Sequence, residues 1–257
     1  SLGDYQIAKE YYTQALDIAQ SIPGNHQNQL AECHHLFGYF YEEQGDLKKA
    51  LEFYLKAFEI CQEEDHLEKS NISNALGRIY RRQGDYNKSL EFHLEALEEI
   101  SSVYKENDIH TSRTYNDLSR VYCSKGEYSK ALEYCLKALE ICKAAHRENH
   151  PDLMYCYDTL GKIYEKKGEY KQALEYHLRN QELIQTLHGK NHSYMGECEC
   201  GVGNAYNRLG EYEKALEHQL RALQILEAVF AFEENPNHPY LADSYSGLAQ
   251  IYYNKKD

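Results

Sequence analysis

The sequence predicts an all-α protein built as a solenoid of repeated pairs of antiparallel helices. Three observations lead to this fold class. A glycine followed by an acid and an apolar residue recurs along the chain, apolar residues recur at helical spacing between these motifs, and no segment alternates polar and apolar residues as a strand does. The motif glycines stand 42, 39, 42, 42 and 42 residues apart. They are Gly3, Gly45, Gly84, Gly126, Gly168 and Gly210.

The repeat at 151–192 shows why each unit should contain two helices. Pro151 suits the first turn of a helix, where its missing N–H costs nothing, and His150 before it can act as the cap. The apolar stripe then recurs about every 3.6 residues, at Leu153, Tyr157, Leu160 and Tyr164. Gly168 should end this helix in the left-handed conformation, and a second helix should begin at Glu169.

Small residues at fixed offsets predict how the two helices of a unit pack. Gly161 in the first helix and Ala173 in the second allow a close approach. Four residues after the small residue of the second helix, several units carry a polar or sulfur side chain. We interpret these as packing residues, not ligands: His93, Cys135, His177 and Gln219.

The pattern resembles the tetratricopeptide repeat (TPR) family. Its signature residues here are Leu160, Gly161, Tyr164, Gly168, Tyr170, Ala173 and Asn180. The long period and Asn149-His150-Pro151 are similar to kinesin light chain repeats, and Gly203-Asn204-Ala205-Tyr206 is similar to Pins-type adaptors. The resemblance implies a right-handed superhelix and a single array over residues 1–257. That array would hold the second helix of a first unit, five full pairs and a final unpaired helix.

Composition and motifs disfavour several classes of function. With 28 basic and 41 acidic residues, the net charge of −13 argues against nucleic-acid binding, and no apolar run is long enough to insert into a membrane. The eight cysteines are expected to be reduced and the protein cytoplasmic. Cys198 and Cys200 have no second pair at zinc spacing, so we expect no metal and no cofactor. Without a phosphate loop, a zinc-protease motif or a nucleophile elbow, the chain is expected not to be an enzyme.

The resemblance also implies which residues face the concave groove, because the family lines it with fixed positions of each first helix. Over six units these positions hold eight basic and seven acidic residues, and five of the basic residues are arginines of the units around Gly77 and Ser119. Arginines pair with carboxylates and asparagine amides can hold a peptide backbone, so the predicted ligand is an acidic peptide segment. The candidate residues are Asn71, Asn74, Arg78, Arg81, Arg82, Arg113, Asn116, Arg120, Tyr155, Lys162, Asn204, Asn207 and Arg208.

Other interpretations of the same residues remain open. Four cations lie where a positive charge offsets the negative end of a helix: Arg81, Arg82, Lys166 and Arg208. The whole stripe could also be a solvated face. The array could be a non-catalytic protein-interaction scaffold, or the sensor or autoinhibitory module of a larger signalling enzyme, such as an ATPase, truncated before Ser1. A purely structural spacer is a third possibility. Lys190, in an expected loop, should not contribute to binding.

Overall fold

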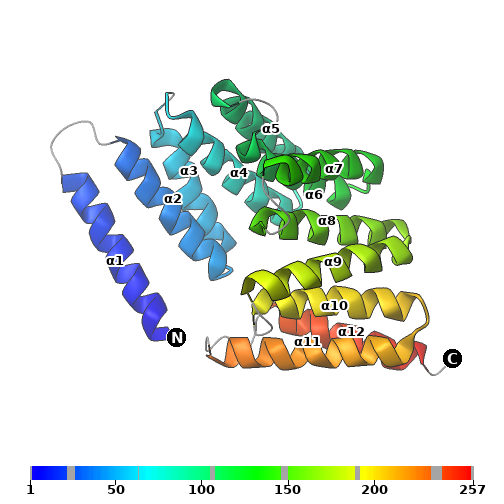
Figure 1. Cartoon of the computed structure of the whole chain (residues 1–257). Coiled ribbons are helices and arrows are strands. Elements are labelled where there is room, and N and C mark those ends of the chain that lie inside the picture. The colour runs from blue at the N-terminus through cyan, green and yellow to red at the C-terminus, as the bar shows by residue number, and fades with distance from the viewer. Residues whose placement is uncertain are drawn as a thin grey trace. The chain divides into compact units, whose positions relative to one another are not determined.

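The computed structural model describes residues 2–21, 27–62, 64–104, 108–145, 150–188, 192–232 and 239–255. Within these ranges the chain forms helices and no strand, which confirms the predicted all-α fold (Figure 1). The helices are α1 (Leu2–Ser21), α2 (Gln27–Glu43), α3 (Leu47–Ile60), α4 (His66–Gln83), α5 (Tyr86–Val103), α6 (Ile109–Ser124), α7 (Tyr128–Ala145), α8 (Pro151–Lys167), α9 (Tyr170–His188), α10 (Ser193–Arg208), α11 (Tyr212–Phe232) and α12 (Pro239–Asn254). Ser1, Asn149 and Lys190 lie outside the described residues.

The helices divide into two compact units, Leu2–Lys125 with α1 to α6 and Gly126–Asp257 with α7 to α12. Within each unit consecutive helices pack together, most extensively in the pairs α2–α3, α4–α5, α8–α9 and α10–α11. The first helices of successive pairs also touch: α4 contacts α2 and α6, and α10 contacts α8 and α12. These first helices therefore present one shared face in each unit. The single array over 1–257 stays a prediction.

The glycine–acid motif builds the turn inside each pair. Gly84 has φ +83°, and the N–H of Asp85 donates to the carbonyl of Tyr80 at 2.9 Å, which closes the end of α4. The Asp85 carboxylate then accepts from the N–H of Lys88 and caps α5. Gly168 takes the predicted left-handed conformation with φ +79°. His150 caps α8 as predicted, with Nδ1 3.2 Å from the N–H of Asp152.

In several pairs, a glycine in the first helix leaves a notch that receives a side chain of the partner helix. A Cβ added to Gly77 would lie 2.6 Å from His93, and one added to Gly161 would collide with His177. Gly38 leaves the same space for Tyr54. His93 and His177 are buried, which confirms that they are packing residues.

Aromatic rings from the two helices of a pair also stack on each other. Tyr80 stacks on Phe92 at 5.4 Å with planes 5° apart, and Tyr164 stacks on Tyr176 at 5.5 Å and 4°. Lys88 places its ammonium 5.0 Å from the centre of the Tyr80 ring. Each such stack adds directional contact to the burial of the rings.

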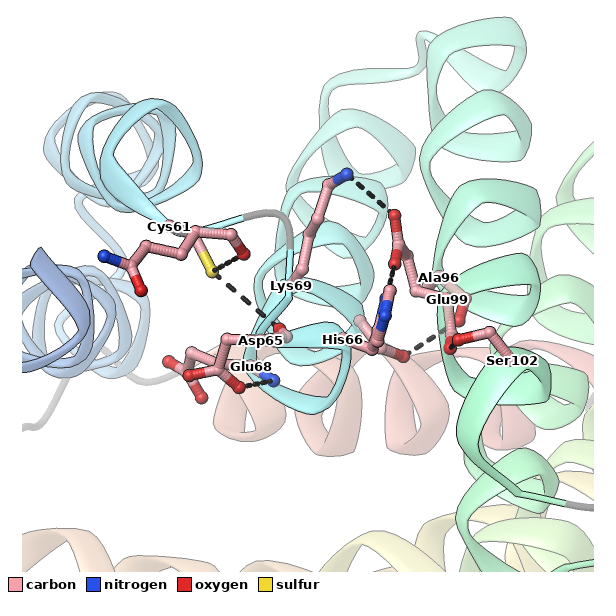
Figure 2. A network of polar contacts seen from close by, with 10 residues as sticks. Cys61, Asp65, His66, Glu68, Lys69, Ala96, Glu99 and Ser102 are labelled. Carbon is pink, nitrogen blue, oxygen red and sulfur yellow. Dashed lines mark hydrogen bonds and ion pairs between the residues drawn. The ribbon is translucent and has the colours of Figure 1, made fainter.

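A polar network joins α4 to α5 at the end where α4 begins (Figure 2). The Glu99 carboxylate lies 2.7 Å from His66 Nδ1 and 2.7 Å from Lys69 Nζ. The Ser70 hydroxyl donates to the carbonyl of Ala96 at 2.9 Å. Asp65 caps α4 by accepting from the N–H of Glu68. The two helices are thereby fixed against each other, and α4 is positioned for the surface described next.

Candidate functional site

The first unit brings four of the predicted arginines into one electrostatic cluster on α4 and α6, called here the α4–α6 arginine cluster. It consists of Arg78, Arg81, Arg82 and Arg120. Burial, followed by the charge of Arg120, lowers the pKa of Arg81 to about 10. Arg82 and Arg78 act in the same direction, and Asp117 offsets them only in part. The surroundings of Arg81 are therefore positive in sum, which is unusual for a partly buried cation.

Two members of the cluster are partly neutralised by an acid from the preceding pair. Glu42, at the end of α2, lies 3.4 Å from Arg78 and 3.8 Å from Arg82. The Tyr54 hydroxyl donates to the same carboxylate at 2.8 Å and holds it in place. Burial alone would lower the pKa of Arg78, but the charges of Glu42, Asp117 and Tyr54 and the hydrogen bond to Glu42 together outweigh burial and raise it. Glu42 is one of the seven acidic residues at the predicted groove positions, but the sequence does not predict its pairing with an arginine of the next unit.

The remaining candidates of this unit are divided between surface and interior. Asn71 and Arg113 are exposed, whereas Asn116 is buried. Asn74 donates to Thr114 Oγ1 at 2.9 Å, and its Oδ1 lies 2.9 Å from His93 Nδ1. Its amide therefore serves the packing of α4 on α5 and α6, which accounts for a poor helix former at this position.

In the second unit, α8, α10 and α12 line a pocket of about 390 Å³, called here the α8–α10–α12 pocket. Four of the five predicted residues of this unit lie in its wall: Lys162, Asn204, Asn207 and Arg208. Lys166 and Asp243, which the candidate set did not include, also line it. Tyr155 lies elsewhere, 39% exposed near the start of α8, with its hydroxyl 3.5 Å from that of Tyr194.

Two of the pocket residues are already engaged within the fold. Lys162 Nζ donates to Asp158 at 2.8 Å and to Glu197 at 2.7 Å, so its charge is balanced by two carboxylates. Asn207 is buried and accepts from Asn254 Nδ2 at 3.1 Å. Lys162 and Asn207 therefore shape the pocket, while the exposed Asn204 and Arg208 remain accessible.

Buried polar atoms beneath these faces are the feature that sequence reasoning missed. His177 is 2% exposed and lines the pocket, yet in the described residues neither ring nitrogen has a hydrogen-bond partner. Its Nε2 lies 3.3 Å from Glu165 Oε1, without hydrogen-bond geometry. His177 can be found in the sequence because it stands four residues after Ala173. Only the structure shows that its ring nitrogens lack hydrogen-bond partners. Buried polar atoms normally have partners, yet His93 Nε2 and Gln219 Oε1, at the matching position of two other pairs, also lack one.

Within the described ranges, no group of three or more His, Cys, Asp or Glu side chains is arranged to hold a metal ion. The eight cysteines are free thiols. None of the described helices has the length and apolar character needed to cross a bilayer.

A family model described as tetratricopeptide repeat matches residues 1–63, 34–100, 68–134, 110–179 and 159–228. No curated protein sequence matches the chain.

Solved structures of similar fold include BtubC (BKLC) from P. vanneervenii, at 21% identity and a TM-score of 0.69, covering 91% of this chain and 94% of that one. A Rap protein complexed with Competence and Sporulation Factor has a TM-score of 0.73 at 16% identity, covering 95% of this chain and 69% of that one. A putative kinesin light chain from Podosopora anserina has a TM-score of 0.57 at 17% identity, covering 77% and 95%. At these identities the likeness concerns the helical repeat solenoid.

Proposed function

Since the chain belongs to the tetratricopeptide repeat family, we propose that it is a non-catalytic protein-interaction scaffold that binds an acidic peptide segment on α4 and α6. The observation that carries the proposal is the α4–α6 arginine cluster. Holding several guanidinium groups close together costs electrostatic free energy in the unliganded protein, and a bound carboxylate relieves that cost.

The electrostatics of the whole chain support the same ligand. With a net charge of −13, the chain repels an acidic segment at long range and attracts it only where cations are concentrated. The fold neighbours include a Rap protein complexed with another factor, which is consistent with a scaffold role. The proposal includes a cytoplasmic location, because reduced cysteines are expected there.

Fluorescence anisotropy with labelled acidic, neutral and basic peptides tests the proposal on the wild type and on Arg81→Gln. We expect acidic peptides to bind best, and Arg81→Gln to weaken them by about tenfold or more, as for loss of a charge-assisted hydrogen bond. Binding should also weaken as salt rises, since partly exposed pairs are screened over about 8–10 Å.

Lys48→Gln is the matched control, because it removes one exposed cation from α3 in the same unit. Thermal melting of both variants verifies that they fold. A preference for basic peptides, or equal losses from Arg81→Gln and Lys48→Gln, would contradict the acidic-peptide site.

A further inference from the structure

The first and last described helices leave large apolar side chains uncovered. On α1 these are Ile7, Ile18 and Tyr11, and Tyr11 is 68% exposed. On α12 they include Tyr245 and Tyr252, each 54% exposed. In the pairs between these two helices, the residues that correspond to the three tyrosines in the repeat are half-buried or buried.

In these inner pairs, one ring of the second helix packs against two residues of the first helix that are seven positions apart. The ring of Tyr176 on α9 lies 5.5 Å from that of Tyr164 and 6.2 Å from that of Tyr157, both on α8. The pair α2–α3 repeats this arrangement with Phe53, Tyr41 and His34. Such contacts between rings add directional attraction to the burial of their surfaces.

The helices α1 and α12 carry the two complementary halves of this arrangement. Tyr11 stands eight residues after its motif glycine, as Tyr176 does. Tyr245 and Tyr252 are seven positions apart, and Tyr252 is in register with Tyr164 of α8. The hydroxyl of Tyr245 donates to Glu227 on α11 at 2.8 Å, while its ring stays exposed.

A small residue shows that the open face of α1 is the one along which the helices of a pair meet. Twelve residues after the motif glycine, α3, α5, α7 and α11 each carry a fully buried alanine, namely Ala57, Ala96, Ala138 and Ala222. Ala15 holds this position on α1 and is exposed. The other side of α1 is covered by α2, where the ring of Tyr12 lies 5.7 Å from that of Phe37.

We propose that α12 of one copy of the chain packs on α1 of a second copy, with the ring of Tyr11 against those of Tyr245 and Tyr252. The occupant is a second copy because the chain itself presents both halves of the missing pair in matching register. The contact joins two unlike faces, so each added copy offers a further α1 or α12 until a ring closes. It goes beyond the proposed peptide binding, since it uses no residue of the α4–α6 arginine cluster.

Sedimentation equilibrium of the 257-residue chain over the micromolar concentration range tests the proposal. The average mass should rise with concentration above that of one chain. Association should strengthen with salt, because each copy carries a net charge of −13 and the repulsion between copies is screened. Acidic peptides at the arginine cluster should show the opposite salt dependence, so the two proposals can fail separately.

Tyr11→Glu and Tyr252→Glu should each weaken the association tenfold or more, because each places a charge in an apolar contact. Both side chains are exposed, and thermal melting verifies that the variants fold. Leu94→Glu on α5 and Leu220→Glu on α11 are the matched controls, since they place the same charge at exposed apolar positions, and they should leave the association unchanged.

A mixture of the two tyrosine variants tests the pairing of unlike faces. Tyr11→Glu keeps an open α12 and Tyr252→Glu keeps an open α1, so together they should form a dimer of one copy each and nothing larger. Self-association of either variant at the wild-type level, no dimer in the mixture, or equal losses from the leucine controls overturns the contact between α12 and α1. A wild-type chain that stays monomeric at every concentration and salt level overturns it as well.

Discussion

Arg81 and Arg78 show that the partner of a charged residue decides what that residue can do. Both were predicted as ligand-binding arginines from their positions in α4. Arg78 lies 3.4 Å from Glu42, which helps to raise its pKa, whereas burial, and after it the charge of Arg120, lowers the pKa of Arg81 to about 10. A carboxylate bound beside Arg81 would offset the repulsion from Arg120, Arg82 and Arg78, so Arg81 is the residue chosen for the binding test.

The left-handed backbone conformation of Gly168 can be tested by a single substitution. Its φ of +79° is strained for residues with a Cβ, and most strained for β-branched ones. Only the Tyr170 hydroxyl, 3.9 Å away, lies near an added Cβ, so the cost is conformational and not steric. We expect Gly168→Val to destabilise the protein by about 1–3 kcal/mol, measured by urea unfolding.

Gly168→Asn is the control for that measurement, because asparagine tolerates the left-handed conformation better than other side chains. Equal destabilisation by Val and Asn would mean that the backbone conformation is not the cause.

At the scale of helices, much of the fold could be predicted because the signals are local. The motif glycines, Pro151 and the recurring apolar residues specify where each helix begins and ends, and the small residues specify which faces meet. The candidate surfaces could be predicted only in part. The positions of Arg81 and Arg208 in the repeat indicated that they lie on the groove face. The pairing of Arg78 with Glu42 and the unsatisfied ring of His177 could not be predicted, because they depend on contacts between helices that no local pattern encodes.

The close packing of α8 on α9 can be tested by substitutions at Gly161 and His177. A side chain at Gly161 would enter the space of the His177 ring, so Gly161→Leu should destabilise the unit by about 1–3 kcal/mol despite the higher helix propensity of leucine. Removing the ring makes room, so His177→Ala combined with Gly161→Leu should cost less than the two single changes added together.

Gln172→Leu, an exposed change on α9, serves as the control and should stay within about 0.5 kcal/mol of the wild type in urea unfolding. Additive losses in the double variant would show that the ring and the glycine do not share one notch.

For the whole molecule, stability in acid depends on carboxylates distributed over both units. The hydrogen bond from His110 lowers the pKa of Asp108. Burial alone would raise the pKa of Glu68, Glu99 and Glu199, but the hydrogen bonds and the charges of their partners together outweigh burial and lower all three. Each of these groups holds its proton less tightly in the folded state than in the unfolded chain. The stability that they add is therefore present above the unfolded pKa and is lost as pH falls through the folded pKa.

Glu199 gives the clearest test of this loss of stability in acid, because its carboxylate is only 3% exposed and lies 2.6 Å from His218 and 3.3 Å from Arg221. Glu199→Gln should cost about 2 kcal/mol at pH 7, since it removes a buried, charged acceptor from His218 and Arg221. That difference should shrink as pH falls below about 4.3, the ordinary value for glutamate, because the wild-type carboxylate then takes up a proton as well. Urea unfolding of both proteins from pH 7 to pH 3 measures it, with Glu182→Gln as the exposed control. A difference that stayed constant down to pH 3 would mean that the amide disrupts packing and that the charge of Glu199 contributes nothing.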